Sequence, residues 1–596
     1  MKRTSIALLL SVVVFAQACN DSFLNVTPET EIGKENFFNT ADDLQMYVNS
    51  MISWPNVMDI SYEISDDETT SGSAEIRNIM TNNLTSENFT GGWSWGALRN
   101  INYFLENFSK ADVPVETLNH YEGVARFHRA LFYMDKVQRF GDVPYYDKVL
   151  ETNDPDLYKP RDTREFVMGK VFEDLDFAAQ HVRASGPVGS VTNDVVRTYL
   201  ARFALFEGTF RKYHTYLGLG GTANEFLQLA RDNAKVIMDS GNYSIYSTGN
   251  ANAYGSLFNS TDLQGNPEVI LLNRSIDGTR NSGWSQTDFG QYEQSNTKAM
   301  VQTYLMADGS FYSSQNGYET YSFVKEFENR DPRLSQSFAY PDWIINNTGT
   351  YAQGMPGTPY KHEINRNFTG YHTLKWYVND PSSSVQNSID VPVLRYAEVL
   401  LIYAEAMAEL GSMSQNVLDQ TVNLLRDRVG MPHLTMDVPK DPMLAARYPG
   451  ISDNVLLEIR RERRVELFNE DHRYEDIVRY GAGKLLEELP KGPYFDGLGN
   501  HDMTGDGIAD LKLIPSTEQI PPVDQREVNE LGEVLVYYRT GDFNSDATVL
   551  LEYGTYGSVL ARDTNGTFEE PKHYYRPIPF SEVQLNPALE QMYGWQ

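Results

Sequence analysis

A short segment between residues 502 and 510 has the spacing of a cation-binding loop. Oxygen-bearing side chains fall at positions 1, 3, 5 and 9 of an EF-hand-like calcium loop: Asp502, Thr504, Asp506 and Asp510. Gly507 falls at position 6, where such a loop turns sharply, but Leu513 replaces the bidentate glutamate of position 12. Two interpretations stay open: a structural Ca2+ site without its strongest ligand, or a Gly/Asp turn in a strand-rich segment.

Cys19 is the only cysteine of the 596 residues, and it directly follows a segment typical of an exported protein. Residues 1–18 have a charged start, an apolar stretch from Ile6 to Ala16 and a small residue, Ala18, at their end. Cleavage before an acylated cysteine would leave several lipid chains, which anchor a protein stably where one chain does not. We therefore expect residues 1–18 to be a lipoprotein signal peptide, Cys19 to be lipidated and residues 19–36 to form a lipidated tether. The alternative is ordinary cleavage after Ala18, which leaves a free thiol.

The composition indicates an acidic protein with a large core. Its formal charge of −31 excludes nucleic acid as a partner, because a polyanion repels another polyanion. With one cysteine there is no intramolecular disulfide, so stability must come from apolar burial, which a chain of this length supports. After the signal segment no apolar run approaches the roughly 20 residues that a membrane span needs.

The sequence shows no recognisable catalytic pattern. It contains no H-E-x-x-H, G-x-S-x-G or P-loop motif and no cluster of Cys and His residues. A glycoside hydrolase needs only two carboxylates beside the scissile bond, but nothing singles out such a pair among the 81 acidic residues. We therefore expect no enzymatic activity and no required cofactor, and a secreted glycoside hydrolase is the remote alternative.

Apolar residues recur at helical spacing in two parts of the chain. Helices are expected at about residues 95–108, 116–140, 164–184, 193–214, 224–240, 394–410, 415–429 and 453–469. On the last of them Arg460, Glu462, Arg463 and Glu466 stand three or four positions apart, which predicts ion pairs along the helix surface. Residues 241–391 are rich in Gly, Asn, Ser and Tyr, and strands are expected near residues 534–538 and 549–553.

Four blocks along the chain resemble the SusD/RagB family of outer-membrane nutrient-binding lipoproteins of the Bacteroidota. They occur in the order of that family and span most of the chain: Cys19–Pro28; Arg126–Tyr133 with Arg139–Pro144; Leu394–Ala406 with Arg460–Leu467 and His472–Asp476; and Tyr575–Pro579. The resemblance implies a mainly α, SusD-like fold with a tetratricopeptide-like helical superhelix, long irregular loops and a small strand-containing insertion.

The same resemblance implies a function. A non-catalytic glycan-binding lipoprotein would capture an oligo- or polysaccharide and deliver it to a SusC-like TonB-dependent transporter, held by its lipid at the outer membrane and facing the cell exterior. A peptide-capturing, RagB-like lipoprotein of the same architecture is the alternative. We expect residues 37–596 to form one domain, with a scaffold mainly at 95–240 and 394–480, ligand-face loops at about 54–94 and 241–392, and the insertion at about 485–573.

A sugar site needs flat aromatic platforms beside side chains that form paired hydrogen bonds, because a pyranose ring has an apolar face and a rim of hydroxyl groups. The irregular stretches offer Trp284, Tyr292 and Trp343 as platforms. The loop at residues 65–69 resembles the family segment that approaches the ligand, which adds three further candidates: Trp54, Tyr62 and Asp67. Buried packing is the alternative for each aromatic residue.

Overall fold

The computed structural model describes residues 37–61, 65–70, 73–249, 252–276, 279–282, 289, 295–347, 356–365, 367–381 and 388–595. Within these ranges the protein is mainly helical with small sheets, as predicted. No helix among the described residues is long and apolar enough to cross a membrane.

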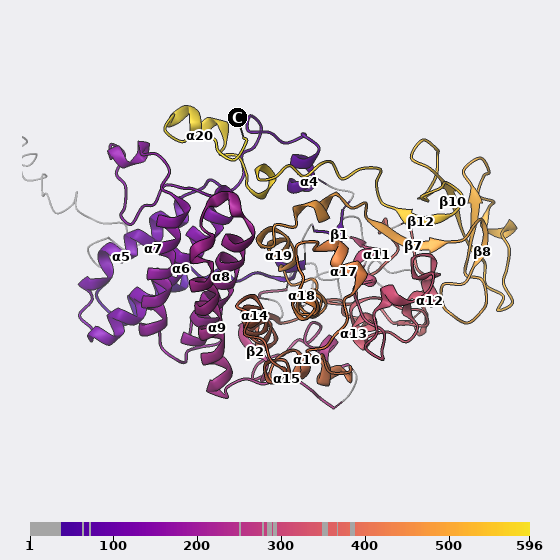
Figure 1. Cartoon of the computed structure of the whole chain (residues 1–596), viewed down its shortest axis with the longest axis horizontal. Coiled ribbons are helices and arrows are strands. Elements are labelled where there is room, and N and C mark those ends of the chain that lie inside the picture. The colour runs from indigo at the N-terminus through magenta and orange to yellow at the C-terminus, as the bar shows by residue number, and fades with distance from the viewer. Residues whose placement is uncertain are drawn as a thin grey trace, which may run out of the picture.

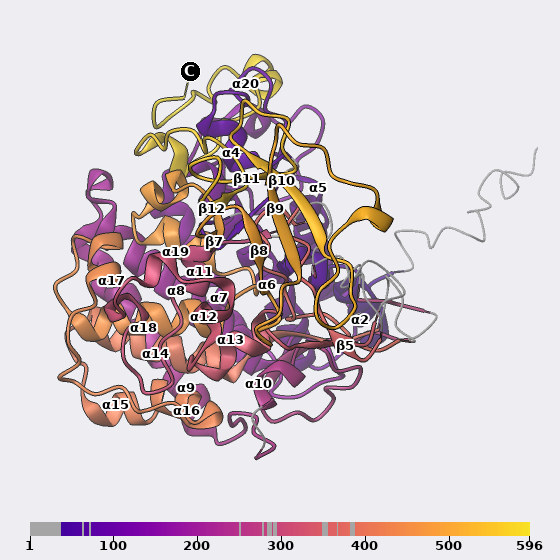
Figure 2. The same ribbon diagram turned by 90° about the vertical axis from the view of Figure 1, so that its right-hand side faces the viewer.

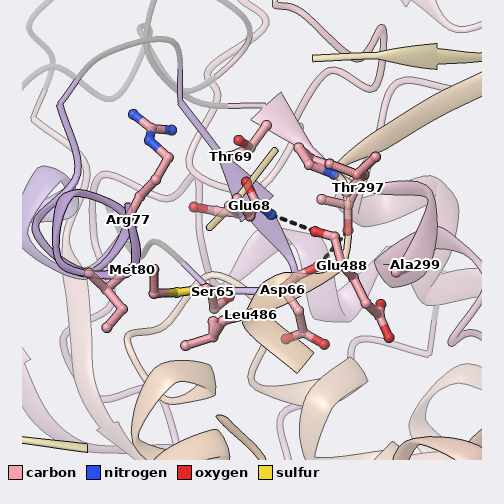
Figure 3. Close-up of a pocket in the computed structure, with 14 residues that line it drawn as sticks. Ser65, Asp66, Glu68, Thr69, Arg77, Met80, Thr297, Ala299, Leu486 and Glu488 are labelled. Carbon is pink, nitrogen blue, oxygen red and sulfur yellow. Dashed lines mark hydrogen bonds between the residues drawn. The ribbon is translucent and has the colours of Figure 1, made fainter. Parts of the chain in front are cut away.

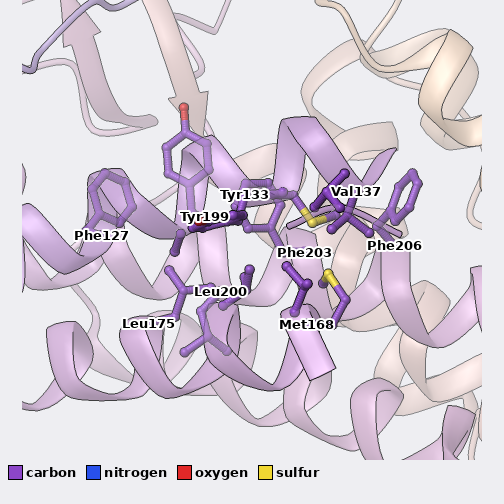
Figure 4. Close-up of a cluster of buried hydrophobic side chains, with 14 of the residues drawn as sticks. Phe127, Tyr133, Val137, Met168, Leu175, Tyr199, Leu200, Phe203 and Phe206 are labelled. Atoms are coloured by element: carbon purple, nitrogen blue, oxygen red, sulfur yellow. The ribbon is translucent and has the colours of Figure 1, made fainter. Parts of the chain in front are cut away.

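Five helices stand side by side in the N-terminal half (Figure 1): α5 (Gly96–Asn107), α6 (Val115–Phe140), α7 (Arg164–His181), α8 (Asn193–Tyr213) and α9 (Ala223–Ser240). Thr163 and Thr192 cap α7 and α8 by accepting hydrogen bonds from the amides of Phe166 and Val195. Phe127, Leu175 and Leu200 belong to the apolar core between α6, α7 and α8 (Figure 4). Burial of these faces stabilises the stack.

The second helical part packs against this stack through α14 (Tyr396–Glu409), which contacts α8, α9 and α18. Nearly every residue of α14 is buried, as expected for a helix that neighbours cover on all sides. Shorter helices surround it: α15 (Gln415–Asp419), α16 (Val422–Val429), α17 (Pro442–Arg447), α18 (Asn454–Glu466) and α19 (Arg473–Arg479). The single helix predicted over residues 415–429 is wrong, because the backbone of Thr421 leaves the helical region and separates α15 from α16.

Short elements and loops precede and follow the helical stack in the sequence, within residues 41–80 and 253–395. They comprise α2 (Ala41–Asn49), α3 (Val57–Ser61), β1 (Glu68–Thr69), α4 (Glu75–Met80), α10 (Ala253–Ser256), β2 (Val269–Asn273), β3 (Ser295–Asn296), α11 (Lys298–Val301), α12 (Phe323–Phe327), α13 (Pro332–Ser337), β4 (Ile344–Ile345), β5 (Thr358–Pro359) and β6 (Val391–Arg395). Strand β6 runs antiparallel to β2 and leads directly into α14. The loop region is therefore attached to the helical core.

The insertion carries a sheet at the far end of the molecule from α5 (Figures 1 and 2). Its strands are β7 (Lys491–Phe495), β8 (Gly499–His501), β9 (Leu511–Pro515), β10 (Val536–Gly541), β11 (Val549–Leu550) and β12 (Gly557–Leu560). The order is β11-β10-β9-β8, with β10 parallel to both β9 and β11, and β12 pairs with β7. The strands predicted near residues 534–538 and 549–553 correspond to β10 and β11 with shifted ends. The chain then returns to the helical stack through α20 (Phe580–Leu585).

The charged run of α18 is buried. Arg460, Glu462 and Arg463 are each less than 5% exposed, and their partners lie on other elements. Arg460 pairs with Glu409 of α14, Glu462 with Arg426 of α16, and Arg463 with Asp476 of α19. The predicted ion pairs along a helix surface are therefore wrong, because these charges join α18 to its neighbours inside the core.

Candidate functional site

The structure brings together two loop segments that lie more than 200 positions apart in the sequence. Strand β1 pairs antiparallel with β3, with Glu68 opposite Asn296. On either side, the amide of Val57 donates to the carbonyl of Ser282 at 3.0 Å, and the amide of Thr297 donates to the carbonyl of Asp67 at 2.8 Å. We call the region formed by residues 54–61, 65–70, 279–282, 289 and 295–297 the loop face, and its strands β1 and β3 are themselves buried. Tyr62, Trp284 and Tyr292 belong to its sequence but lie outside the described residues, so their ligand contacts stay predictions.

Asp67 is the part of the loop face that belongs to a buried ionic cluster. The Arg464 Nε donates to Asp67 Oδ1 at 2.7 Å, and the Asp67 side chain is 4% exposed. Asp66 accepts two hydrogen bonds from Arg473, at 2.7 and 2.8 Å, and also pairs with Arg447 and Arg464. The cluster therefore gives Asp67 a supporting position, in which it holds the loop against α18.

The pKa values of the two carboxylates of this cluster shift in opposite directions. Burial by itself raises the pKa of Asp66, but the guanidinium groups of Arg464 and Arg473 hold that pKa well below its ordinary value. Burial raises the pKa of Asp67, and the charge of Asp66 adds to this effect against the attraction of Arg464. Asp66 is therefore the carboxylate of the pair that stays ionised more readily.

A small cavity lies beside β1 (Figure 3). Its lining includes Ser65, Thr69, Arg77, Thr297 and Glu488, and its volume is about 30 Å3. A space of this size holds about one water molecule. It is too small for a sugar ring, so it does not add a ligand pocket to the loop face.

Trp54 fixes the connection between α2 and α3 to the helical stack. Its indole Nε1 donates to the carbonyl of Gly189 at 2.6 Å, and its ring lies nearly parallel to that of Tyr199 at a centroid distance of 6.4 Å. The side chain is half-buried. These contacts give Trp54 an anchoring position, while its ligand contact stays a prediction.

Trp343 lies inside an aromatic cluster of the irregular region. Its ring contacts Phe289 at 5.4 Å, Tyr360 at 5.8 Å and Tyr377 at 6.1 Å between centroids, and the residue is 8% exposed. The cluster partners come from distant loops, and no local pattern in the sequence indicates them. In this structure the ring packs against protein, which corresponds to the buried alternative for this residue.

The carboxylates of the loop at residues 502–510 are bonded to the backbone of that loop. Asp502 accepts hydrogen bonds from the amides of Gly505 and Gly507, at 2.6 and 2.9 Å, and Asp506 accepts from Ile508. Asp510 accepts from the amides of Met503 and Thr504 at 2.8 and 2.9 Å. Across the part of the chain that the structure describes, no group of three or more His, Cys, Asp or Glu side chains is placed to hold a metal ion. Both interpretations of this loop stay predictions, and these hydrogen bonds favour the Gly/Asp turn.

We expect Ca2+ and EDTA to leave the Tm of the protein unchanged. The amides of the turn already donate hydrogen bonds to the carboxylates of Asp502 and Asp510, so we expect the loop to fold without an ion. A site filled at 100 times its Kd would instead add about 2.7 kcal/mol. Differential scanning calorimetry with EDTA and with millimolar Ca2+ measures the difference. A rise of Tm with Ca2+ that Asp502→Asn abolishes would contradict the expectation and establish a calcium site.

A second surface lies on the helical stack, away from the loop face. An apolar groove of about 480 Å3 runs between the start of α5, the segment at residues 144–158 and α20, and Trp93 and Trp95 contribute to its lining. At its edge Tyr158 is 61% exposed and Leu585 is 69% exposed. Exposed apolar patches with a polar rim often mark protein interfaces. We call this surface the stack groove.

A stack of paired helices joined to a region of long loops and short strands defines a helical scaffold protein. The SusD family model matches residues 267–595, and a model described as "Starch-binding associating with outer membrane" matches residues 33–199. The chain therefore belongs to the SusD family, and the predicted family and fold are confirmed. Members of this family are non-catalytic binding proteins associated with the outer membrane.

Individual relatives match over most of their length. SusD-like proteins P38 and P2 of Formosa agariphila are both 24% identical to this chain, cover 82% and 83% of it, and match over 93% and 94% of their own lengths. Two crystal structures from Bacteroides fragilis, of a SusD-like protein and of a SusD-like carbohydrate-binding protein, have TM-scores of 0.67. They are 20% and 21% identical, cover 96% and 93% of this chain, and match over their whole lengths. At this identity the structures show the shared fold.

Proposed function

We propose that this protein is a cell-surface glycan-binding lipoprotein that captures an oligo- or polysaccharide and delivers it to a SusC-like TonB-dependent outer-membrane transporter. The observation that carries the proposal is membership of the SusD family over both helical parts of the chain. The carbohydrate-binding relative from Bacteroides fragilis supports a sugar as the ligand. The Cys19 anchor and the tether at residues 19–36 would keep the protein at the outer membrane.

The loop face is the proposed place of capture. Its β1–β3 pairing joins residues 65–70 to residues 295–297. Trp284 and Tyr292 precede β3 in the sequence, and aromatic residues of this kind suit the apolar face of a sugar ring. The buried ion pairs of Asp66 and Asp67 with Arg464 hold this loop against α18. A fixed loop lowers the entropy that a ligand must supply on binding.

The stack groove is the proposed contact with the transporter. Its apolar lining and exposed edge residues, Tyr158 and Leu585, are typical of a surface that a protein partner covers. It lies on a different part of the molecule from the loop face, so one surface remains free for the ligand while the other contacts the barrel. A peptide as ligand, as in RagB-like proteins, would use the same two surfaces.

A binding screen tests the proposal. The chain from residue 20 onward is exposed to panels of glycans and peptides, and the products are checked for cleavage. We expect saturable binding of a glycan without turnover, and Trp284→Ala should weaken it about tenfold, which corresponds to ~1.4 kcal/mol. Tyr553→Ala is the matched control, because Tyr553 is an exposed aromatic residue of the insertion.

Two results would overturn this function. Tight binding of peptides with no glycan signal would assign the protein to peptide capture, and accumulation of cleaved glycan would contradict a non-catalytic role.

The variant Trp343→Ala tests whether the ring of Trp343 serves packing or ligand binding at the aromatic cluster. Because Trp343 is buried against Phe289 and Tyr360, we expect this change to lower Tm rather than affinity alone.

A further inference from the structure

The loop of residues 502–510 also forms part of the wall of a pocket. Thr504 and Gly505 form one wall of a pocket of about 330 Å3, and the opposite walls are α12, α13 and the segment Tyr340–Asp342. We call it the insertion pocket. Its side chains include two aromatic rings and several oxygen donors and acceptors: Phe327, Glu328, Ser335, Tyr340, Asp342 and Thr504. Ligand sites typically have volumes of roughly 300 Å3 or more.

Gly505 brings the loop close to the opposite wall. Its φ is +86°, a conformation that residues with a side chain rarely adopt. A Cβ atom at this position would lie 3.3 Å from Pro341 Cβ and 3.4 Å from Val324 Cγ1. The glycine therefore lets the insertion close one side of the pocket, which neither the helical scaffold nor the insertion could form alone.

One carboxylate of the insertion pocket, that of Asp342, is available for hydrogen bonds. The Asp342 side chain is exposed at the rim and has no hydrogen-bond or ion-pair partner among the described residues. A ligand that supplies hydroxyl groups would satisfy this carboxylate.

The charges of the pocket disfavour an anionic ligand. Glu328 and Asp342 are the exposed carboxylates of the lining, and only Glu328 is paired, with the exposed Lys325 at 2.7 Å. Asp331 is bonded to the buried Arg333 at 2.7 Å. The guanidinium of Arg330 donates to backbone carbonyls, including those of Val301 and Tyr304, so it does not offer a free cation to the pocket. An unpaired negative charge remains at the rim.

We infer that the insertion pocket is a second carbohydrate site, which holds one uncharged pyranose ring. Phe327 and Tyr340 provide apolar surface for the ring, and the carboxylate of Asp342 accepts hydrogen bonds from two neighbouring hydroxyl groups. Uronic acids and sulfated sugars are repelled by the same carboxylate. The inference rests on the proposed glycan-binding function and adds a site outside the loop face.

Titration with simple glycosides tests this site separately from the loop face. The probes are the methyl glycosides of glucose, galactose and mannose, together with methyl glucuronide as the anionic probe. Ligand-observed NMR on the chain from residue 20 onward measures the affinity of each. At least one neutral glycoside should bind, Asp342→Asn and Tyr340→Ala should each weaken it about tenfold or more, and Trp284→Ala should leave it unchanged. The glucuronide should not bind.

The variants are chosen so that loss of folding is recognised. Asp342 has a φ of +68°, which Asn also tolerates, so Asp342→Asn should preserve both the backbone and Tm. Tyr553→Ala in the insertion is the matched aromatic control and should leave affinity for the glycosides unchanged.

Each outcome decides between the two sites. Neutral glycosides that bind equally well to wild type, Asp342→Asn and Tyr340→Ala would overturn the insertion pocket as a sugar site. So would capture of larger glycans, sensitive to Trp284→Ala, with no binding of any simple glycoside; in both cases the proposed function stands. If neither simple glycosides nor glycans bind, the proposed function fails together with this inference.

Discussion

Glu466→Gln should lower the free energy of unfolding by about 3–5 kcal/mol at neutral pH. The carboxylate of Glu466 is fully buried and lies 2.5 Å from Arg428, 3.1 Å from Arg395 and 3.2 Å from Arg333. Gln keeps the shape of the side chain but removes the negative charge that these guanidinium groups share. Buried cations without enough countercharge are strongly destabilising, which is why a conservative change should have a large effect.

The effect should depend on pH in a defined direction. Burial by itself raises the pKa of Glu466, but Arg428, Arg395 and Arg333 lower it from 4.5 to about 2. The unfolded chain therefore binds a proton at a higher pH than the folded protein. The stability from this carboxylate is complete above about pH 4.5 and is lost as the pH falls towards 2, a difference of about 3 kcal/mol. The wild type and Glu466→Gln should therefore approach each other in stability at acidic pH.

Urea unfolding at neutral pH and near pH 3 measures this difference. Glu173→Gln is the matched control, because Glu173 pairs with Lys170 at 2.7 Å on the surface, with its side chain 64% exposed. That change should cost less than about 1 kcal/mol at either pH. Equal losses of stability in both variants, or a loss in Glu466→Gln that does not depend on pH, would contradict the role given to the buried cluster.

The buried cluster also shows where sequence reasoning reaches its limit. The long helices α6, α8 and α14 follow directly from apolar residues at helical spacing, because this pattern is local. The charged run of α18 has the spacing of surface ion pairs, and the sequence does not indicate that it is buried. Its partners Asp66, Glu409 and Arg333 stand 51 to 398 positions away, so only tertiary packing reveals them.

The loop regions show the same limit at the level of single residues. The stretch Tyr340–Trp343 is predicted to contact ligand through Trp343, but the structure buries that ring among Phe289, Tyr360 and Tyr377. Its neighbours Tyr340 and Asp342 line the insertion pocket instead. Without a regular element there is no periodicity, and sequence alone does not tell which of adjacent side chains faces solvent. Likewise, the spacing of residues 502–510 predicts a loop with ordered carboxylates but not that they bond to its own amides.

Cys19→Ala should move the protein from the membrane to the soluble fraction. Each buried CH2 group of an acyl chain contributes about 0.8 kcal/mol to membrane binding, so loss of several chains removes most of the affinity. The charge of −31 opposes attraction to anionic lipid, so the protein part should add little membrane affinity of its own. The proposed function uses the lipid as its attachment, and this variant tests it.

Fractionation and acyl labelling measure this change. The residues Ala16 and Ala18 form a pattern that ordinary secretory cleavage accepts, so the variant should still be processed and released. Ser22→Ala, three residues further on, is the matched control and should stay labelled and membrane-bound. Glycan affinity in solution should be the same for both variants, because the substitution lies in the tether rather than in the loop face. A Cys19→Ala protein that remains in the membrane after cleavage, or a wild type that takes up no acyl label, would show that the protein is held by another contact and that the cysteine is a free thiol.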